Sequence, residues 1–199
     1  MLVANDTYHY DIHMIRGDSK DYNLLDNWVR SLKVGTVTLS CEIGVREGLG
    51  SKIIMDGIRD RTSIYSHFGI DPYNNLKYQH YDNSLSYTAD YTDDMRLQLE
   101  KDLSVYPEFK LFHMTDIQFM EKHSEYFNYE FVHFDGPHMT KDVINEAVYF
   151  ARKSAANARF VFDDYKLFNM DLICKILSYY NFKVMDKGEN KICLEKQTL

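Results

Sequence analysis

Four short apolar runs in this 199-residue chain each end at an acidic residue. The acids are Glu42 after residues 36–41, Asp71 after 65–70, Asp135 after 131–134, and the pair Asp163 and Asp164 after 160–162. Such runs are typical of buried strands, and open α/β sheets bind ligands in the crevice at the carboxyl ends of parallel strands. Acids delivered to one crevice would bind hydroxyl groups, a cation, or both.

The acids after the last two runs predict a cation site. Successive parallel strands are neighbours, so we expect Asp135 to converge with Asp163 and Asp164. Three carboxylates close together repel one another unless a positive charge lies between them. An all-oxygen cluster selects a hard divalent ion, Mg²⁺ first and Ca²⁺ or Mn²⁺ next. His138 follows Asp135 by three residues, and its ordinary pKa of about 6.5 suits a general base near neutral pH.

Structural roles are the alternative for each of these residues. Asp163 and Asp164 could be the N-cap of a helix and its neighbour, where the helix dipole favours negative charge. His138 could bond the backbone of a turn. His133 lies in mid-strand and is expected to pack or hydrogen-bond internally. The other histidines show no spacing typical of ligands: His67, His80, His113 and His123.

A glycine-containing turn, residues 42–50, follows the first run. Glycine allows a sharp turn and a close approach of a ligand to the backbone. The turn does not fit the G-x-G-x-x-G phosphate fingerprint, and an acid before the first glycine would repel a pyrophosphate, which disfavours a nicotinamide oxidoreductase. Asp71 ends the next strand, where an acid can accept hydrogen bonds from a ribose diol. The Asp71-Pro72 pair could instead simply start a turn.

This turn resembles the first motif of the class I S-adenosylmethionine-dependent methyltransferases, an E/D-x-G-x-G-x-G-like loop. Here Glu42-x-Gly44-x-x-x-Gly48 matches a relaxed form in which Arg46 stands at the middle glycine. The resemblance implies S-adenosylmethionine as the cofactor. By this resemblance Gly44 and Gly48 would approach the methionine part, Asp71 the ribose hydroxyls, and Asp116 would lie beside the adenine. The cofactor-binding residues that it implies are Glu42, Gly44, Gly48, Asp71, Asp116 and Asp135. Asp116 could equally cap the following helix.

Two further segments resemble the macrocin-type, metal-dependent sugar O-methyltransferases. In that family the fourth strand ends in D-G-x-H and the fifth in D-D-Y. The matching segments here are residues 135–138 (DGPH) and 163–165 (DDY), and the resemblance as a whole spans about residues 36 to 195. It implies that Asp135, Asp163 and Asp164 bind the metal ion and that His138 is the catalytic base.

The elements that must position these residues alternate along the chain. Apolar periodicity predicts helices at 21–32, 49–59, 93–103, 141–153 and 170–179, with Thr92 or Asp93 capping the third. Strands are predicted at 36–41, 63–70, 109–114, 131–134 and 160–162, and the segments 182–185 and 191–195 form a closing hairpin. We therefore expect an α/β fold: a Rossmann-like, doubly wound, mostly parallel seven-stranded sheet with a C-terminal antiparallel hairpin and helices on both faces.

One domain is expected over residues 1–199, with an N-terminal helical segment at 1–34. Residues 74–91 are rich in tyrosine and lack regular periodicity. The stretch 74–92 is therefore interpreted either as a lid or substrate rim, or as a solvated insertion. Exposed aromatics at 8–10 and 78–91 would suit a homo-oligomer. The net charge of −7, without a basic cluster, disfavours a nucleic-acid partner.

The sequence also indicates where the protein acts. Three widely spaced cysteines fit a reducing environment, and no signal peptide or membrane span is evident, so we expect a cytoplasmic protein without a membrane partner. The predicted function is methyl transfer from S-adenosylmethionine to a hydroxyl of a sugar or other small molecule, assisted by Mg²⁺. The alternatives are a metal-free methyltransferase acting on nitrogen or carboxylate, and a non-catalytic cofactor-fold binding protein.

Overall fold

The computed structural model describes residues 15–17, 19–62 and 64–198. Its centre is a seven-stranded sheet in the order β5-β2-β1-β6-β7-β9-β8. The strands are β1 (Val37–Ile43), β2 (Ile64–Ile70), β5 (Phe109–Phe112), β6 (Tyr129–Phe134), β7 (Ser154–Phe162), β8 (Phe182–Lys187) and β9 (Ile192–Lys196). The first five are parallel, and β9 pairs antiparallel with both β7 and β8. The predicted fold class, including the closing hairpin, is confirmed.

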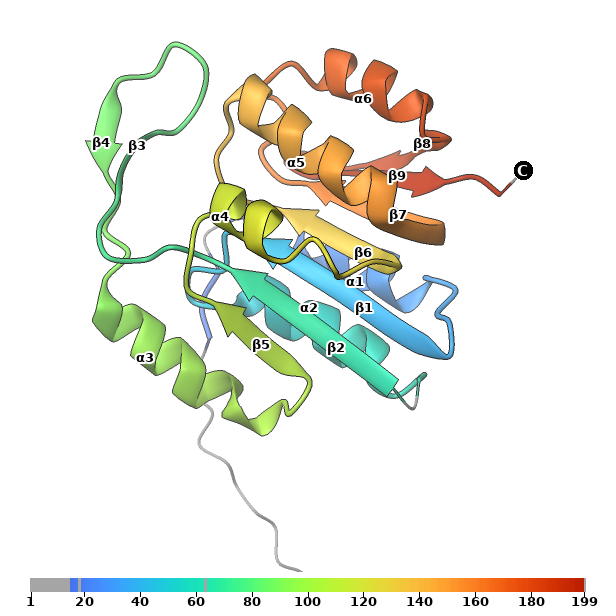
Figure 1. Ribbon diagram of the computed structural model, residues 1–199, viewed down its shortest axis with the longest axis horizontal. Helices are drawn as coiled ribbons and strands as arrows, with labels where there is room; N and C mark the ends of the chain where they lie inside the picture. Colours follow the sequence, from blue (N-terminus) through green and yellow to red (C-terminus); the bar gives the residue numbers. More distant parts are fainter. Residues whose placement is uncertain (1–14, 18, 63, 199) are drawn as a thin grey trace, which may run out of the picture.

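Helices cover both faces of the sheet (Figure 1). The helices α4 (Asp116–Lys122), α5 (Thr140–Lys153) and α6 (Met170–Ser178) pack on one face, where Phe119, Phe150 and Ile173 belong to the largest buried cluster. The helices α1 (Tyr22–Arg30), α2 (Leu49–Ile58) and α3 (Asp93–Asp102) lie on the other, and a short 3-10 turn (Leu103–Val105) follows α3. No helix among the described residues is both long and apolar enough to cross a membrane.

The order of the strands creates a crevice between β1 and β6. The chain runs from β1 outward to β2 and β5, and then returns to place β6 on the other side of β1. Connections on either side of this reversal leave in opposite directions, which opens the sheet's carboxyl edge to a ligand. The loops after β1 and β6 meet there: the Asp135 N–H donates to the Ile43 carbonyl at 2.8 Å.

The segment 74–92 is more ordered than its lack of periodicity suggests. It contains two short antiparallel strands, β3 (Lys77–Gln79) and β4 (Ser86–Thr88), which project beyond the carboxyl ends of the main strands (Figure 1). Three-residue strands are too short to show an apolar alternation. The segment also joins the sheet's connecting loops, because the His138 N–H donates to the His80 carbonyl at 2.8 Å.

Several predicted boundaries shift for reasons that tertiary pairing supplies. β1 continues through Glu42 to Ile43, since both residues pair with β2 and β6. β7 begins at Ser154, directly after α5, although residues 154–157 (SAAN) carry no strand pattern. The helix that follows residue 115, for which the sequence predicted no bounds, is α4. The predicted contact surface at residues 8–10 lies outside the described residues.

Candidate functional site

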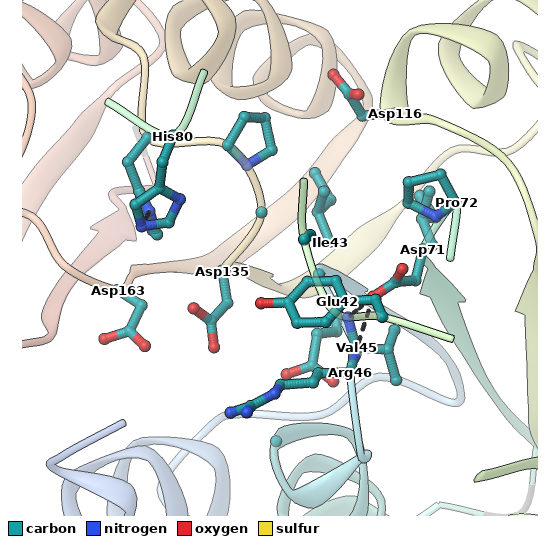
Figure 2. Close-up of a pocket in the computed structure, with 18 of the residues that line it drawn as sticks. Glu42, Ile43, Val45, Arg46, Asp71, Pro72, His80, Asp116, Asp135 and Asp163 are labelled. Atoms are coloured by element: carbon teal, nitrogen blue, oxygen red, sulfur yellow. Dashed lines mark hydrogen bonds between the residues drawn. The ribbon is translucent and has the colours of Figure 1, made fainter. Parts of the chain in front are cut away.

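The nine residues proposed from the sequence line a single cavity of about 510 Å³ at the carboxyl ends of β1, β2, β6 and β7. They are Glu42, Gly44, Gly48, Asp71, Asp116, Asp135, His138, Asp163 and Asp164. Figure 2 shows Asp135 and Asp163 side by side with His80 near them, and Asp71 on the opposite side of the loop that follows β1. The structure therefore brings together residues spread over more than 120 positions of the chain.

The glycine turn needs a backbone that side chains rarely allow. Gly44 has φ = 80°, and a Cβ there would collide with the carbonyl oxygen of Asp135. Gly48, with φ = 90°, is the residue before α2. Arg46, which stands where the related motif has its middle glycine, also has a positive φ of 49°. The loop thus keeps the glycine-like shape at Arg46 without the glycine.

Asp71 shapes this loop through its carboxylate (Figure 2). Its Oδ2 accepts the N–H groups of Val45 at 2.9 Å and Arg46 at 3.0 Å, and its Oδ1 accepts the Tyr73 N–H at 3.0 Å. The side chain is buried, and burial raises its pKa although these three bonds oppose the rise. A turn-starting role at Asp71-Pro72 therefore does not describe it fully, because two of its bonds cross to the loop after β1.

Glu42 belongs to a buried polar chain beneath the cavity. Its Oε2 accepts the Ser51 hydroxyl at 2.5 Å, and its Oε1 lies 2.7 Å from Nδ1 of His133. The Ser51 hydroxyl also lies 2.9 Å from Nε2 of His67, a neutral imidazole whose pKa burial lowers to about 3. The expectation that His133 hydrogen-bonds internally is confirmed. Glu42 consequently ties β1 to α2 and β6.

Asp116 is not a helix cap. Thr115 is the N-cap of α4, and it forms a capping box in which its hydroxyl accepts the Gln118 N–H while the Gln118 side chain accepts the Thr115 N–H. Asp116 lies in the first turn, lines the cavity, and interacts with the buried Glu146 of α5. Burial raises the pKa of both carboxyls, and their mutual interaction raises that of Glu146 further. The capping alternative for Asp116 is wrong.

Asp163 and Asp164 cap no helix either, since α6 begins at Met170 with Asn169 as its N-cap. Asp163 forms a buried ion pair with Lys191, with Nζ 2.7 Å from Oδ2, and both side chains are almost fully enclosed. Burial alone would raise the pKa of Asp163, but the Lys191 ammonium reverses this and lowers it. Burial and the charge of Asp163 raise the pKa of Asp135 well above its ordinary value. A lysine thus supplies positive charge where the sequence predicted an ion.

The described residues contain two clusters whose donor atoms could hold a metal ion, and neither is the predicted trio of aspartates. One is Glu42, His133 and Asp135; the other is His80, His138 and Asp164. His138 is 3% exposed, and its pKa falls to about 4 because of burial and the neighbouring His80. His80 gave no spacing signal in the sequence, because 58 residues separate it from its partner.

Comparisons with known proteins agree with this architecture. The sequence matches no protein-family model, and no curated protein sequence is similar enough to align with it. Among solved structures, the O-methyltransferase of Bacillus cereus in complex with SAH (S-adenosylhomocysteine) is similar at 9% identity, with a TM-score of 0.58 over 94% of this chain and 84% of that one. The N-methyltransferase NodS of Bradyrhizobium japonicum gives 9% identity and a TM-score of 0.55, over 89% and 94%.

An rRNA methylase of Streptococcus thermophilus gives 8% identity and a TM-score of 0.57, over 92% of this chain and all of that one. These likenesses show that the chain has the Rossmann-like fold of S-adenosylmethionine-dependent methyltransferases. The three proteins are named an O-methyltransferase, an N-methyltransferase and an rRNA methylase, so the shared fold does not select an acceptor. The narrower resemblance to macrocin-type enzymes stays a prediction.

Proposed function

We propose that this protein transfers the methyl group of S-adenosylmethionine to a hydroxyl of a small molecule, with sugars as the first class to test. The convergence of four acid-bearing strand ends on one cavity carries the proposal. Its volume of about 510 Å³ suits a small-molecule site. Carboxylates along the wall favour a cofactor with sulfonium and ammonium groups, whereas a net charge of −7 disfavours an RNA acceptor. Three free cysteines support action in the reducing cytoplasm.

The cofactor's parts are assigned to the residues that shape the crevice. The backbone at Gly44 and Gly48, which carries no side chain, would lie against the methionine part of the cofactor. The buried hydrogen bonds of Glu42 lie beneath it. The Asp71 carboxylate accepts three N–H groups, and a carboxylate offers about four acceptor sites. One site therefore remains for a ribose hydroxyl. Asp116 would face the adenine, and Asp135 would lie near the reacting sulfur.

A Mg²⁺ ion on Asp135, Asp163 and Asp164 does not fit the residues present. The Lys191 ammonium already neutralises Asp163. An ion at the trio would have to displace Lys191, whose side chain is completely buried. We therefore assign no chemical step to Mg²⁺ at this position.

The acceptor hydroxyl must be aligned with the S–methyl bond, and orientation of this kind can supply about 7–11 kcal/mol of a barrier. His138 is the group proposed to take the proton. Burial and His80 lower its pKa to about 4, so the imidazole is neutral at pH 7 but weakly basic. Such a base does not ionise a free hydroxyl beforehand; it accepts the proton while the new C–O bond makes the oxygen acidic.

Calorimetry with S-adenosylhomocysteine tests the cofactor assignment, followed by turnover on a panel of sugar, phenolic and amine acceptors. We expect one binding site, lost in Gly44→Ala because the new Cβ meets the Asp135 carbonyl. His138→Ala should keep that binding and lose methyl transfer. Absence of cofactor binding by the folded wild type would refute the proposal. Cofactor binding without turnover on any acceptor would favour a non-catalytic binding protein.

A further inference from the structure

His80 and His138 face one another across a long side-chain hydrogen bond. Nε2 of His80 lies 3.3 Å from Nδ1 of His138, and the two rings are nearly perpendicular. This distance is slightly longer than the about 2.7–3.2 Å of protein N–H···O bonds. Two nitrogens bound at 2.0–2.1 Å to one tetrahedral ion would be about 3.3–3.4 Å apart. The pair therefore already has the spacing of two ligands of one metal ion.

Asp164 completes a three-donor cluster. One donor atom each from His80, His138 and Asp164 lies within 4.8 Å of the other two. Asn190 occupies Oδ1 of Asp164, and this bond orients the carboxylate while leaving Oδ2 for an ion. Asp164 is partly exposed, so its rotatable side chain can close the remaining distance. A hydrogen-bonded carboxylate is the usual support for a metal ligand.

The second ring nitrogen of His138 bears on which nitrogen can bind an ion. The side chain is 3% exposed, and its Nε2 is buried without a hydrogen-bond partner among the described residues. A buried polar atom without a partner is destabilising. With Nδ1 turned towards His80, a ring proton on this buried Nε2 leaves Nδ1 in the tautomer that can bind a metal ion.

The fold holds this cluster in place through the segment 74–92. The backbones of Tyr81 and His138 form a bridge of the parallel type, and the His138 N–H donates to the His80 carbonyl. Asp82 then accepts both the N–H and the hydroxyl of Thr140, the first residue of α5. His80 is thereby fixed over the cavity by main-chain bonds rather than by its own side chain.

We propose that His80, His138 and Asp164 bind one divalent transition-metal ion of the Zn²⁺ type at the acceptor side of the cavity. Two imidazoles and one carboxylate form a donor set for Zn²⁺, Fe²⁺ or Co²⁺, whereas Mg²⁺ requires oxygen ligands. Three protein ligands leave a coordination position open to the cavity, as in catalytic zinc sites.

Metal binding by this cluster does not depend on the methyl-transfer chemistry, but its role there rests on the proposed function. An ion at the open position would hold the acceptor hydroxyl and lower its pKa, as zinc lowers that of bound water to about 7. In that case His138 would hold the ion, and the acidified hydroxyl would give its proton to water instead of to His138.

Titration of the chelator-treated, dialysed full-length protein with Co²⁺ tests the site, followed by displacement with Zn²⁺. Calorimetry gives the stoichiometry, and the visible d–d absorption of Co²⁺ reports low-symmetry coordination by nitrogen and oxygen. The variants are His80→Ala and Asp164→Asn. His123→Ala is the matched control, because this histidine pairs with Glu125 on another part of the surface. Asp135→Asn tests whether the ion binds elsewhere, because Asp135 belongs to the aspartate trio and to the Glu42 cluster but not to the proposed site.

We expect one Co²⁺ per chain in the wild type, in His123→Ala and in Asp135→Asn. His80→Ala and Asp164→Asn should each weaken binding at least about tenfold, the loss that even an outer-shell change produces. Circular dichroism of each variant checks that the loss is not unfolding. No bound ion in the wild type overturns the proposal, as does full binding by folded His80→Ala or a comparable loss in Asp135→Asn. Binding of S-adenosylhomocysteine, measured separately, decides the proposed function independently of these results.

Discussion

Replacing Lys191 with methionine should be among the most damaging single changes near the cavity. Its ammonium lies 2.7 Å from Asp163, donates to the Ser19 hydroxyl at 2.9 Å, and is 5.0 Å from the centre of the Tyr22 ring. Lysine and aspartate are 0% and 1% exposed, so water cannot take over the lysine's role. Breaking a buried pair by removing one partner costs about 3–5 kcal/mol, because the remaining charge is left uncompensated.

That loss corresponds to a fall in melting temperature of about 6–20 °C, since 1 kcal/mol shifts a domain of this size by about 2–4 °C. Urea unfolding, followed by the fluorescence of Trp28, the chain's single tryptophan, measures the loss of unfolding free energy directly. Lys20→Met is the matched control. Lys20 also pairs with an acid, Glu189, but the two side chains are 66% and 63% exposed, so no measurable change in stability is expected.

The double variant Lys191→Met/Asp163→Asn identifies the cause. It removes both charges, so it should be more stable than Lys191→Met alone even though one more native side chain is lost. A loss below about 1 kcal/mol in Lys191→Met would show that the carboxylate tolerates isolation, contrary to the buried-pair argument. A double variant no more stable than the single one would show that packing, not charge, is responsible.

Three other changes test separate parts of the structure. Glu146→Gln should flatten the pH dependence of the free energy of unfolding. Burial and Asp116 raise the pKa of Glu146 well above 4.5 in the folded protein. The wild-type carboxyl therefore makes its full contribution to stability below pH 4.5, and that contribution is lost as the pH rises towards the raised pKa. Urea unfolding of both proteins at pH 5 and pH 8 checks this, and parallel curves would contradict it. Thr115→Ala should cost about 1 kcal/mol, because it removes the capping box of α4. Ser104→Ala, at the exposed middle residue of the 3-10 turn, serves as its comparison. Asp82→Ala should speed proteolysis within 74–92 with little change in melting temperature, because it removes the bonds to Thr140 that hold the segment; an unchanged cleavage rate would mean that the backbone pairing at His138 suffices.

The sequence determined the fold and the places where acids gather. Apolar runs that end in carboxylates can be recognised locally, and the parallel topology then brings their ends to one edge. Asp71, Asp135 and Asp163 line the same cavity for that reason. The capping box of α4 was also readable, as Thr115 followed three residues later by Gln118, a pattern that a search for helix starts would detect.

Tertiary structure alone decided which charges and donors meet inside the cavity. Lys191 lies in the turn between β8 and β9, directly before β9. No spacing in the sequence pairs it with Asp163, 28 positions earlier. The antiparallel pairing of β9 with β7 brings the two side chains together. His80 comes from a segment without apolar periodicity, and main-chain bonds to residue 138 place its ring. Local patterns record which residues a strand buries, whereas contacts between distant loops depend on how complete elements pack. For this reason the acids could be predicted, but the lysine that neutralises one of them and the second histidine could not.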